Sequence, residues 1–539
     1  MPNATDDQVV ALLPALENAA RADPANTASC FVPPRIGILE QTAANRQLFV
    51  FGRRGVGKSM LLRTIEQDRA KFGAEVLFID VETLRGRPYP DVLIELLIKL
   101  LDALKDGLNT SLKHKGRQAQ LQALPTRWGM RRLRRELAQL LAEPQQATRT
   151  VTKGETHDDT RAGGVVVPPV KGLWFFGKRR RASQRESRSD AEFTETKMEG
   201  LLGAVEKIRR LFGQTSVQLG GTPTLVVLDD FYHVKFEDQP QVLAYLHQVV
   251  KNLPIYLKVC GVRHRINEFA EGDPPTGLQI GHDAGDVSLD ITLEEFAAAQ
   301  RFLEAVLNGV AANTGLKVED LVTDTGRERL VLGSGGVARD YLDLVSKALR
   351  KASEREARPD RPHNRITAED VNEVATALFN RKQEDLKRDV GPGADRLRER
   401  QTDIVRFCLD HNHTNVFLVE GINLTETDWG KDIETLADLR LMHKLGDFSL
   451  PSPGWRGRRF VGYTLDLTHW TGVRSERIHQ IEFWRSGERQ NLRRTGLVYD
   501  PERTQGQSQP AAQRSAAATG DPVNWDQPPL PFDEEEATA

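Results

Sequence analysis

The chain has 539 residues, and its 74 Lys and Arg residues nearly balance 76 Asp and Glu residues, giving a formal net charge of −2 at pH 7. This balance excludes a uniformly basic nucleic-acid coat protein and a strongly acidic disordered chain, although local charged patches remain open. Hydrophobic residues make up 39% and charged residues 28%, which is typical of a globular protein with buried cores. A chain of this length is expected to form about three or four domains.

The cysteines and the apolar runs bear on the cellular compartment. Cys30, Cys260 and Cys408 are too far apart in sequence to suggest a zinc site or a disulfide framework. No apolar run reaches the roughly 20 residues that span a bilayer, and the first residues lack the basic-then-apolar order of a signal peptide. We therefore expect a cytoplasmic protein with reduced cysteines.

The first half of the chain alternates between apolar, strand-like runs and helix-like stretches. An N-terminal helical segment is expected within residues 1–34, interrupted by Pro14. Short continuous apolar strands that alternate with helices predict a parallel sheet covered on both faces, and therefore an α/β core over residues 35–290. Strands are predicted at residues 47–51, 75–81, 224–228 and 255–262, and helices at 60–65 and 89–104.

A basic insertion interrupts this alternation at about residues 105–220. Residues 111–135 carry eight Lys and Arg residues and no acidic residue, and residues 171–188 form a second basic stretch. Residues 144–171 are rich in Gly, Thr, Pro and Val, which predicts irregular structure, and helical periodicity returns at about 192–212. The basic stretches could follow a nucleic-acid backbone or serve as flexible, solubilising loops.

The second half of the chain predicts a helical region followed by a mixed one. Residues 291–385 are predicted to be helical, and a charged linker is predicted at 381–395. Residues 501–539 are rich in Pro, Gln, Ala and Ser and end in an acidic run, which is typical of a disordered tail. Between them we predict a helix, a strand at 415–419, a helix at 427–444, a basic turn at 454–459 and a strand at 460–467.

The clearest functional motif follows the first predicted strand. Residues 52–59 match the P-loop pattern G-x-x-x-x-G-K-[ST] between a strand and a helix. Glycines there let backbone N–H groups surround phosphate oxygens, and the following helix adds the positive end of its dipole. Lys58 is expected to reach the terminal phosphates of ATP, and Ser59 to ligate Mg²⁺; the alternative is an ordinary Gly-rich turn. The predicted phosphate-binding residues are Gly52, Arg53, Arg54, Gly55, Val56, Gly57, Lys58, Ser59 and Met60.

A pair of acidic residues ends the third predicted strand. Asp229 and Asp230 follow the run Thr224–Leu228, and the carboxyl end of such a strand lies beside the P-loop. Asp229 is predicted to hold the water shell of the magnesium ion, and Asp230 to orient or deprotonate the attacking water. The alternative is an acidic turn with no catalytic role.

Two arginines are further candidates for the same site. Arg263 follows the fourth predicted strand, where a guanidinium is placed to contact the γ-phosphate. Arg339 opens a helix in the region 291–385, and from there it could bridge to a bound phosphate and couple that region to the nucleotide state. For each of them a solvated or salt-bridged surface arginine is an equally open alternative.

This order of motifs resembles that of AAA+ ATPases of the origin-recognition initiator type. The resemblance implies a P-loop core with a parallel sheet, a helical lid over residues 291–385 and a winged-helix domain over 395–500. It also implies that residues 52–59 are the Walker A motif, that the two aspartates are the Walker B motif and that Arg339 is the lid sensor. Two departures, Asp at position 230 and Arg at position 263, resemble STAND-type signalling ATPases instead.

The resemblance also suggests where nucleic acid binds. In a winged helix the second helix can enter the major groove of DNA, and the hairpin can contact the backbone. The candidate contacts to double-stranded DNA are Arg440 and Lys444, which flank the predicted helix, and Arg456, Arg458 and Arg459 at the hairpin tip. The alternative is a protein-docking module with a solvated basic turn.

These observations favour an ATP-binding and ATP-hydrolysing protein that uses Mg²⁺ and whose nucleotide state controls DNA binding or assembly on DNA. We expect it to act as a homo-oligomer or as part of a complex with partner proteins. The alternative is a nucleotide-switched signalling or scaffold ATPase, of the kind found in bacterial defence systems, whose winged helix docks a protein.

Overall fold

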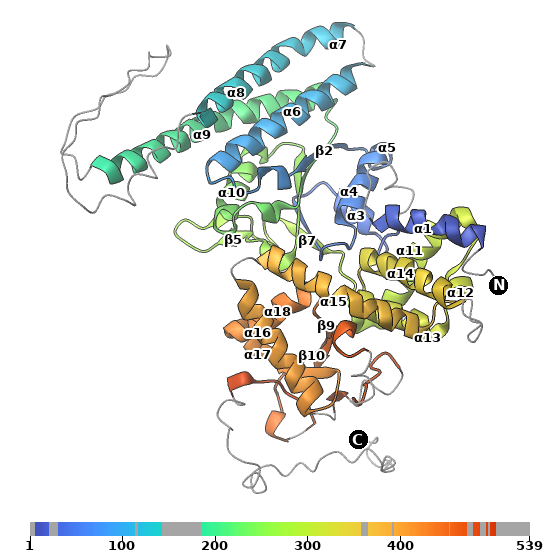
Figure 1. The fold of residues 1–539 in the computed structure, drawn as a ribbon. Coiled ribbons are helices and arrows are strands. Elements are labelled where there is room, and N and C mark those ends of the chain that lie inside the picture. The colour runs from blue at the N-terminus through green and yellow to red at the C-terminus, as the bar shows by residue number, and fades with distance from the viewer. Residues whose placement is uncertain are drawn as a thin grey trace, which may run out of the picture. The chain divides into compact units, whose positions relative to one another are not determined.

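The computed structural model divides into two compact units, which are described separately. The sheet unit comprises Arg21–Asp290, and the helical unit comprises Met1–Ala20 together with Ile291–Ala539 (Figure 1). No helix among the described residues is both long and apolar enough to cross a membrane. The structure describes residues 6–20, 31–113, 117–142, 185–356, 365–390, 393–451, 453–471, 478–485, 492–493 and 496–502.

The sheet unit is built on five parallel strands in the order β2-β3-β4-β1-β7. The register sets Asp229 beside Asp80 and Phe51 beside Gly261, so the carboxyl ends of the strands meet at one edge. This sheet and its helices confirm the predicted α/β fold with a parallel-sheet core that carries the P-loop. The strands are β1 (Leu48–Phe51), β2 (Glu75–Asp80), β3 (Thr224–Asp229), β4 (Ile255–Gly261) and β7 (Gly285–Ser288).

The edge strand β7 was not predicted from the sequence. Its residues, Gly-Asp-Val-Ser, do not form an apolar run, and only Val287 among them is buried. An edge strand has a single neighbour, here β1, and can leave side chains in water on its open side. The apolar pattern that identified the other four strands is therefore not required of it, although β2 at the opposite edge keeps that pattern.

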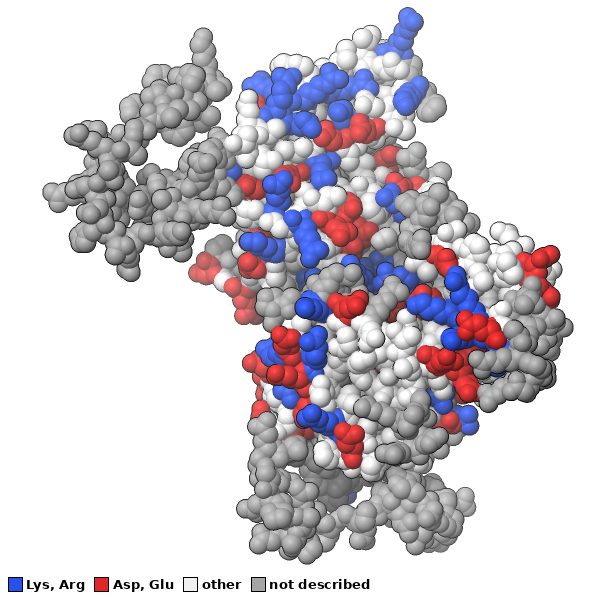
Figure 2. Space-filling model, in the orientation of Figure 1, with Lys and Arg blue, Asp and Glu red and all other residues white. Residues whose placement is uncertain are grey.

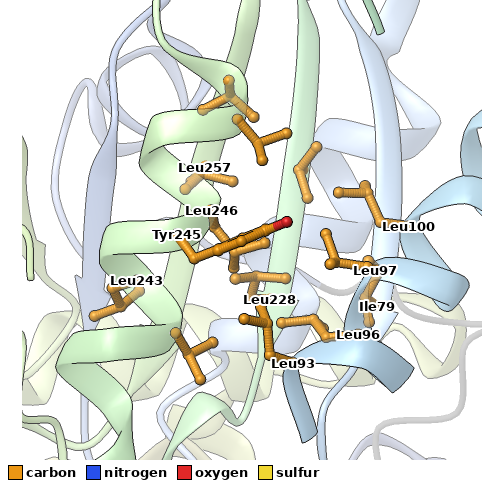
Figure 3. Packing of buried hydrophobic residues seen from close by; sticks show 14 of the residues in the cluster. Ile79, Leu93, Leu96, Leu97, Leu100, Leu228, Leu243, Tyr245, Leu246 and Leu257 are labelled. Atoms are coloured by element: carbon orange, nitrogen blue, oxygen red, sulfur yellow. The ribbon is translucent and has the colours of Figure 1, made fainter. Parts of the chain in front are cut away.

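Helices on the sheet close the core of this unit. Leu93, Leu96, Leu97 and Leu100 recur at helical spacing on α6 (Asp91–Lys113), so they lie on the side of α6 that faces the strands. Figure 3 shows them against Leu228 of β3 and the leucines of α10 (Gln239–Val250). The remaining elements of the unit are α3 (Ile38–Ala43), α4 (Lys58–Gln67), α5 (Arg69–Phe72) and the short strands β5 (Phe269–Ala270) and β6 (Thr276–Gly277).

The basic insertion is helical wherever the structure describes it. Helix α6 continues to Lys113, and α7 (Arg117–Gln122), α8 (Leu124–Ala142) and α9 (Arg185–Gln218) follow, with α8 packed against both α6 and α9. Of the two alternatives for the basic stretches, flexible loops are therefore wrong for residues 117–135. Met130, Leu133 and Leu137 recur on one side of α8, and their burial holds this arginine-rich sequence in a helical bundle. The predicted irregular segment 144–171 and most of the basic stretch 171–188 lie outside the described residues.

The helical unit is mainly helical over the described residues of the region predicted to be helical, and it corrects two other predictions. Pro14 does not interrupt the N-terminal helix α1 (Asp7–Ala20), which packs against α11 and α14. The predicted linker at 381–395 was wrong as far as Val390, because helix α15 (Ala368–Val390) runs through it. The other helices are α11 (Phe296–Ala311), α12 (Val318–Leu321), α13 (Asp324–Ser334) and α14 (Ala338–Glu356).

The same unit ends in a three-stranded antiparallel sheet with the order β8-β10-β9. Helix α18 (Asp428–Asp438) is shorter than the helix predicted at 427–444, because Arg440 adopts a left-handed conformation with φ 65° and the chain then forms β9. The remaining elements are α16 (Ala394–Val405), β8 (Val416–Glu420), α17 (Gly421–Glu426), β9 (Met442–Phe448) and β10 (Phe460–Leu465).

A buried carboxylate joins α15 to this sheet. Asp466 is fully buried and accepts hydrogen bonds from Lys382 of α15 at 2.6 Å and, on the same oxygen, pairs with His443 of β9 at 2.9 Å. Burial by itself raises the pKa of Asp466, but the charges and hydrogen bonds of Lys382 and His443 outweigh it and hold that pKa well below its usual value. The ionised carboxylate is therefore a part of the folded unit.

We expect Asp466→Asn to lower the free energy of unfolding by about 3–5 kcal/mol, because it leaves Lys382 buried without a counter-charge. Since the folded-state pKa of Asp466 is lowered, its contribution is complete above the unfolded pKa of about 3.9 and is lost as the pH falls below it. Urea unfolding at neutral and acidic pH measures both effects. The exposed Asp395→Asn on α16 is the control, and an equal effect of the two variants would contradict the prediction.

Candidate functional site

The P-loop connects β1 to α4, and its glycines hold the shape of the turn. Gly55 and Gly57 have φ angles of 88° and 99°, which a side chain would strain. A Cβ on Gly52 would lie 2.7 Å from Cγ2 of Val56, so the turn closes only around a glycine. No side chain caps α4, and the N–H groups of its first turn are thus left for a ligand.

Lys58 opens α4 and points back into this loop. Its side chain is buried, and its Nζ donates to the carbonyl oxygens of Gly52 at 2.8 Å and Arg53 at 3.3 Å. Burial lowers the pKa of Lys58, while the negative charges of Asp230 and Asp229 oppose that shift. An ammonium group held by two carbonyls can exchange them for phosphate oxygens without moving far.

Ser59 and Asp229 form the contact that joins the two predicted halves of the site. The Ser59 hydroxyl donates to Oδ2 of Asp229 at 2.7 Å. Burial and the charge of Asp230 raise the pKa of Asp229, and the bond from Ser59 together with the charge of Lys58 opposes this rise. A hydroxyl and a carboxylate oxygen side by side are ligands of the kind Mg²⁺ takes together with waters and phosphates, so the donor set fits that ion.

Asp230 has a different environment from Asp229. It adopts a left-handed backbone conformation with φ 50°, unusual for a residue other than glycine. Its carboxylate gathers with Glu82 and His233, and one ligand-type atom from each of the three lies within 4.8 Å of the other two. Sequence reasoning missed Glu82 and His233, although the first stands just after β2 and the second three residues after Asp230.

Arg53 is held by a residue that sequence reasoning also missed. Asp290 accepts from the backbone N–H of Arg53 at 2.8 Å and from its guanidinium Nε at 3.2 Å. The Arg53 side chain is 7% exposed, so it fixes the first turn of the loop to the segment after β7. Asp290 follows the unpredicted strand by two residues, which is why no pattern pointed to it.

The two other candidate arginines, Arg263 and Arg339, belong to different units of the chain. Arg263 lies just after β4, pairs with Asp286 of β7 at 2.9 Å and has its guanidinium 4.4 Å from the Phe51 ring centre. Arg339 lies in the first turn of α14 in the helical unit, which is described apart from the P-loop. The phosphate contact of Arg263 and the sensor role of Arg339 remain predictions.

Two of the five candidate nucleic-acid contacts lie elsewhere than predicted. Arg440 is 6% exposed and donates to Asp340 of α14 at 2.5 Å, so its guanidinium is engaged inside the helical unit. Lys444 belongs to strand β9 and is half-buried, rather than flanking a helix. The cause for both is the early end of α18.

The basic turn between β9 and β10 keeps the other three arginines at the surface. Arg458 pairs with Glu420 at 3.2 Å and lies over the Trp455 ring, and Arg459 pairs with Asp447. Arg456 is exposed and has no ion pair among the described residues. The turn therefore offers one unpaired cation and two that are partly neutralised.

Comparisons with known proteins add little to this geometry. No protein-family model matches the sequence, and no curated protein matches it. The chain is similar to the crystal structure of Cdc6p from Pyrobaculum aerophilum at 13% sequence identity and a TM-score of 0.32, with 84% of this chain and 97% of that chain covered. The description of the fold rests on the sheet order and the P-loop contacts.

We expect Asp229→Asn to raise the free energy of unfolding of the protein without added ligand by roughly 0.5–2 kcal/mol. The substitution removes a buried charge beside Asp230 and keeps an oxygen that accepts from Ser59. Because the folded-state pKa of Asp229 is raised, its ionised form costs stability as the pH rises through that pKa, so the gain is largest at neutral pH and disappears in acid.

Thermal and urea unfolding at pH 7 and at about pH 4 measure this gain. The exposed Asp106→Asn on α6 is the matched control, with no change expected. A lower stability of Asp229→Asn at pH 7 would show that the carboxylate is favourably compensated in the empty site.

Proposed function

We propose that the protein binds and hydrolyses ATP with Mg²⁺, and that its nucleotide state controls DNA binding or assembly on DNA. The observation that carries the ATPase part is the hydrogen bond between Ser59 and Asp229 beside the buried Lys58. It brings a phosphate-binding loop and a metal-binding carboxylate together from positions 170 residues apart. An acidic turn with no catalytic role would not require this contact.

The roles of the residues follow from their positions. The loop N–H groups and Lys58 bind and orient the triphosphate, and Ser59 and Asp229 hold the magnesium ion, which supplies charge neutralisation at the phosphates. Asp230 orients the attacking water and takes up its proton. Arg263 and Arg339 are the proposed sensors of the terminal phosphate from the sheet unit and the helical unit, respectively.

The C-terminal part supports the proposed DNA contact. We propose that residues 395–500 act as a winged helix, supported by the element order α16, β8, α17, α18, β9 and β10 and by the sheet order β8-β10-β9. In that arrangement α18 is the recognition helix and the turn 454–459 is the wing tip. Arg456, Arg458 and Arg459 would then meet phosphates of double-stranded DNA.

One observation favours the second candidate function, a nucleotide-switched signalling or scaffold ATPase. Arg458 and Arg459 are each paired with a carboxylate of the same sheet, Glu420 and Asp447. These carboxylates would be repelled by a DNA backbone, whereas a docking protein surface tolerates them. In that case the basic turn contacts a partner protein.

The ATPase assignment predicts different outcomes for two substitutions. Lys58→Ala removes the charge that binds the terminal phosphates and should abolish ATP binding and hydrolysis. Asp230→Asn should keep binding and slow turnover by about 100-fold or more, because it removes the group that accepts a proton. Calorimetry with Mg²⁺ and ATP and a phosphate-release assay measure the two effects, with the exposed Lys71→Ala as control. Parental hydrolysis by both variants would show that the assignment is wrong.

The DNA proposal predicts that Arg456→Ala weakens binding of a double-stranded DNA fragment and lowers the slope of log affinity against log salt by about one. Replacing Arg458 and Arg459 as well should weaken binding further, but by less for each than Arg456→Ala, since each is partly neutralised by a carboxylate partner. Titrations at several salt concentrations measure this. Absent binding at low salt, together with a change of assembly mass on ATP alone in size-exclusion chromatography, would favour the signalling function.

A further inference from the structure

The outward face of helix α8 is part of neither the P-loop site nor the C-terminal sheet. The inward side of α8 is buried against α6 and α9 through Met130, Leu133 and Leu137. Figure 2 shows Lys and Arg side chains gathered over the part of the sheet unit where Figure 1 draws α7 and α8. Residues 117–142 contain six arginines and one glutamate; they are Arg117, Arg127, Arg131, Arg132, Arg134, Arg135 and Glu136.

The arginines of this segment differ in how far they are engaged within the unit. Arg134 makes two hydrogen bonds to Asp102 of α6, at 2.8 and 3.0 Å, and Arg132 pairs with Glu136 at 3.0 Å. Arg131 and Arg135 are exposed and form no ion pair within the described part of the chain. These two guanidinium groups therefore keep their full capacity to bind an anion.

An exposed aromatic residue lies in line with these two cations. Trp128 is 62% exposed, and Trp128, Arg131 and Arg135 follow each other at spacings of three and four residues, which places them on one face of the helix. They span two turns, about 10 Å. Arg132 borders the face, with its guanidinium 6.0 Å from the Trp128 ring centre.

This combination is typical of contacts to a single nucleic-acid strand. Guanidinium groups bind phosphates through paired hydrogen bonds, and an exposed indole stacks with a base of any sequence. A duplex hides its bases in the stack and leaves the indole without this contact. A membrane surface fits less well, because Met130, Leu133 and Leu137 of α8 are already buried against α6 and α9. The exposed large apolar side chains of α8 are then Leu124 and Trp128, too few to insert.

We propose that the face of α8 formed by Trp128, Arg131, Arg132 and Arg135 binds single-stranded nucleic acid. Arg131 and Arg135 bind successive phosphates, and Trp128 stacks on a base between or beside them. This surface is separate from the DNA contact proposed for the turn 454–459. Its binding does not depend on ATP hydrolysis, since α8 lies in the insertion rather than at the edge of the sheet that carries the P-loop.

The test uses the full chain and a labelled oligo-dT of roughly 20 nucleotides, longer than the usual single-strand site. Replacing both Arg131 and Arg135 with Ala should weaken binding at least tenfold and lower the slope of log affinity against log salt by about 1.4. Trp128→Ala should weaken binding at least fivefold, and Trp128→Phe should restore most of it. The control replaces two exposed lysines of the same unit, Lys71 and Lys251, with Ala and should bind as the parent.

Two further measurements test the proposal even if a variant folds poorly. Oligo-dT carrying photoreactive 5-iodouracil should crosslink the parental protein within residues 117–142, and the α8 variants should keep parental ATP binding. Crosslinks confined to the turn 454–459 would overturn the proposal. It would also be overturned if Trp128→Ala bound as tightly as the parent while polyglutamate of equal charge displaced the strand, since the face would then be a docking surface for acidic proteins.

Discussion

The hydrogen bond from Ser59 to Asp229 forms because of the one constraint on which this site depends, the order of the parallel strands. Parallel strands end at the same edge of a sheet, so a loop after β1 and a carboxylate at the end of β3 become neighbours once β4 lies between those strands. The buried leucines of α6 and α10 pack against these strands and hold them in register (Figure 3). The position of the functional groups is thus a consequence of the hydrophobic core rather than of contacts among themselves.

The same site contains several charged side chains, and burial disfavours their charged forms. Lys58 has its pKa lowered and Asp229 has its pKa raised, both chiefly by loss of water. A bound cation and a triphosphate would supply the compensating charges, so the empty site carries a cost that the proposed ligand removes. The negative charge of Asp290 opposes a part of the pKa shift of Lys58, and its hydrogen bonds to Arg53 fix the loop. By contrast, the buried Asp466 of the helical unit has its partners within the chain, which identifies it as a structural charge.

Arginine has two different uses in this protein. Arg53, Arg134 and Arg440 each bind a carboxylate of another element and thereby fix a loop, a helix pair or the end of α18. Arg131 and Arg135 are left at the surface of a helix that buries Met130, Leu133 and Leu137 on its other side. A basic stretch in the sequence contains both kinds, and only the partners of each side chain distinguish structural arginines from those that can bind a ligand.

Local pattern by itself determined four of the five strands of the parallel sheet, the P-loop and the acidic pair, because a buried parallel strand must be apolar and a phosphate loop must contain glycine at fixed places. It also determined the helical character of the described residues between 291 and 385. The edge strand β7, the clamp from Asp290, the Glu82 and His233 neighbours of Asp230 and the burial of Arg440 depended on tertiary structure. Each of these features depends either on a residue far away in the chain or on an element with one open side. Neither kind of feature produces a periodic or compositional pattern in its own segment. The helical bundle of the insertion belongs to the same group, since the arginine-rich composition left loops open as an alternative and packing against α6 and α9 decided for helices.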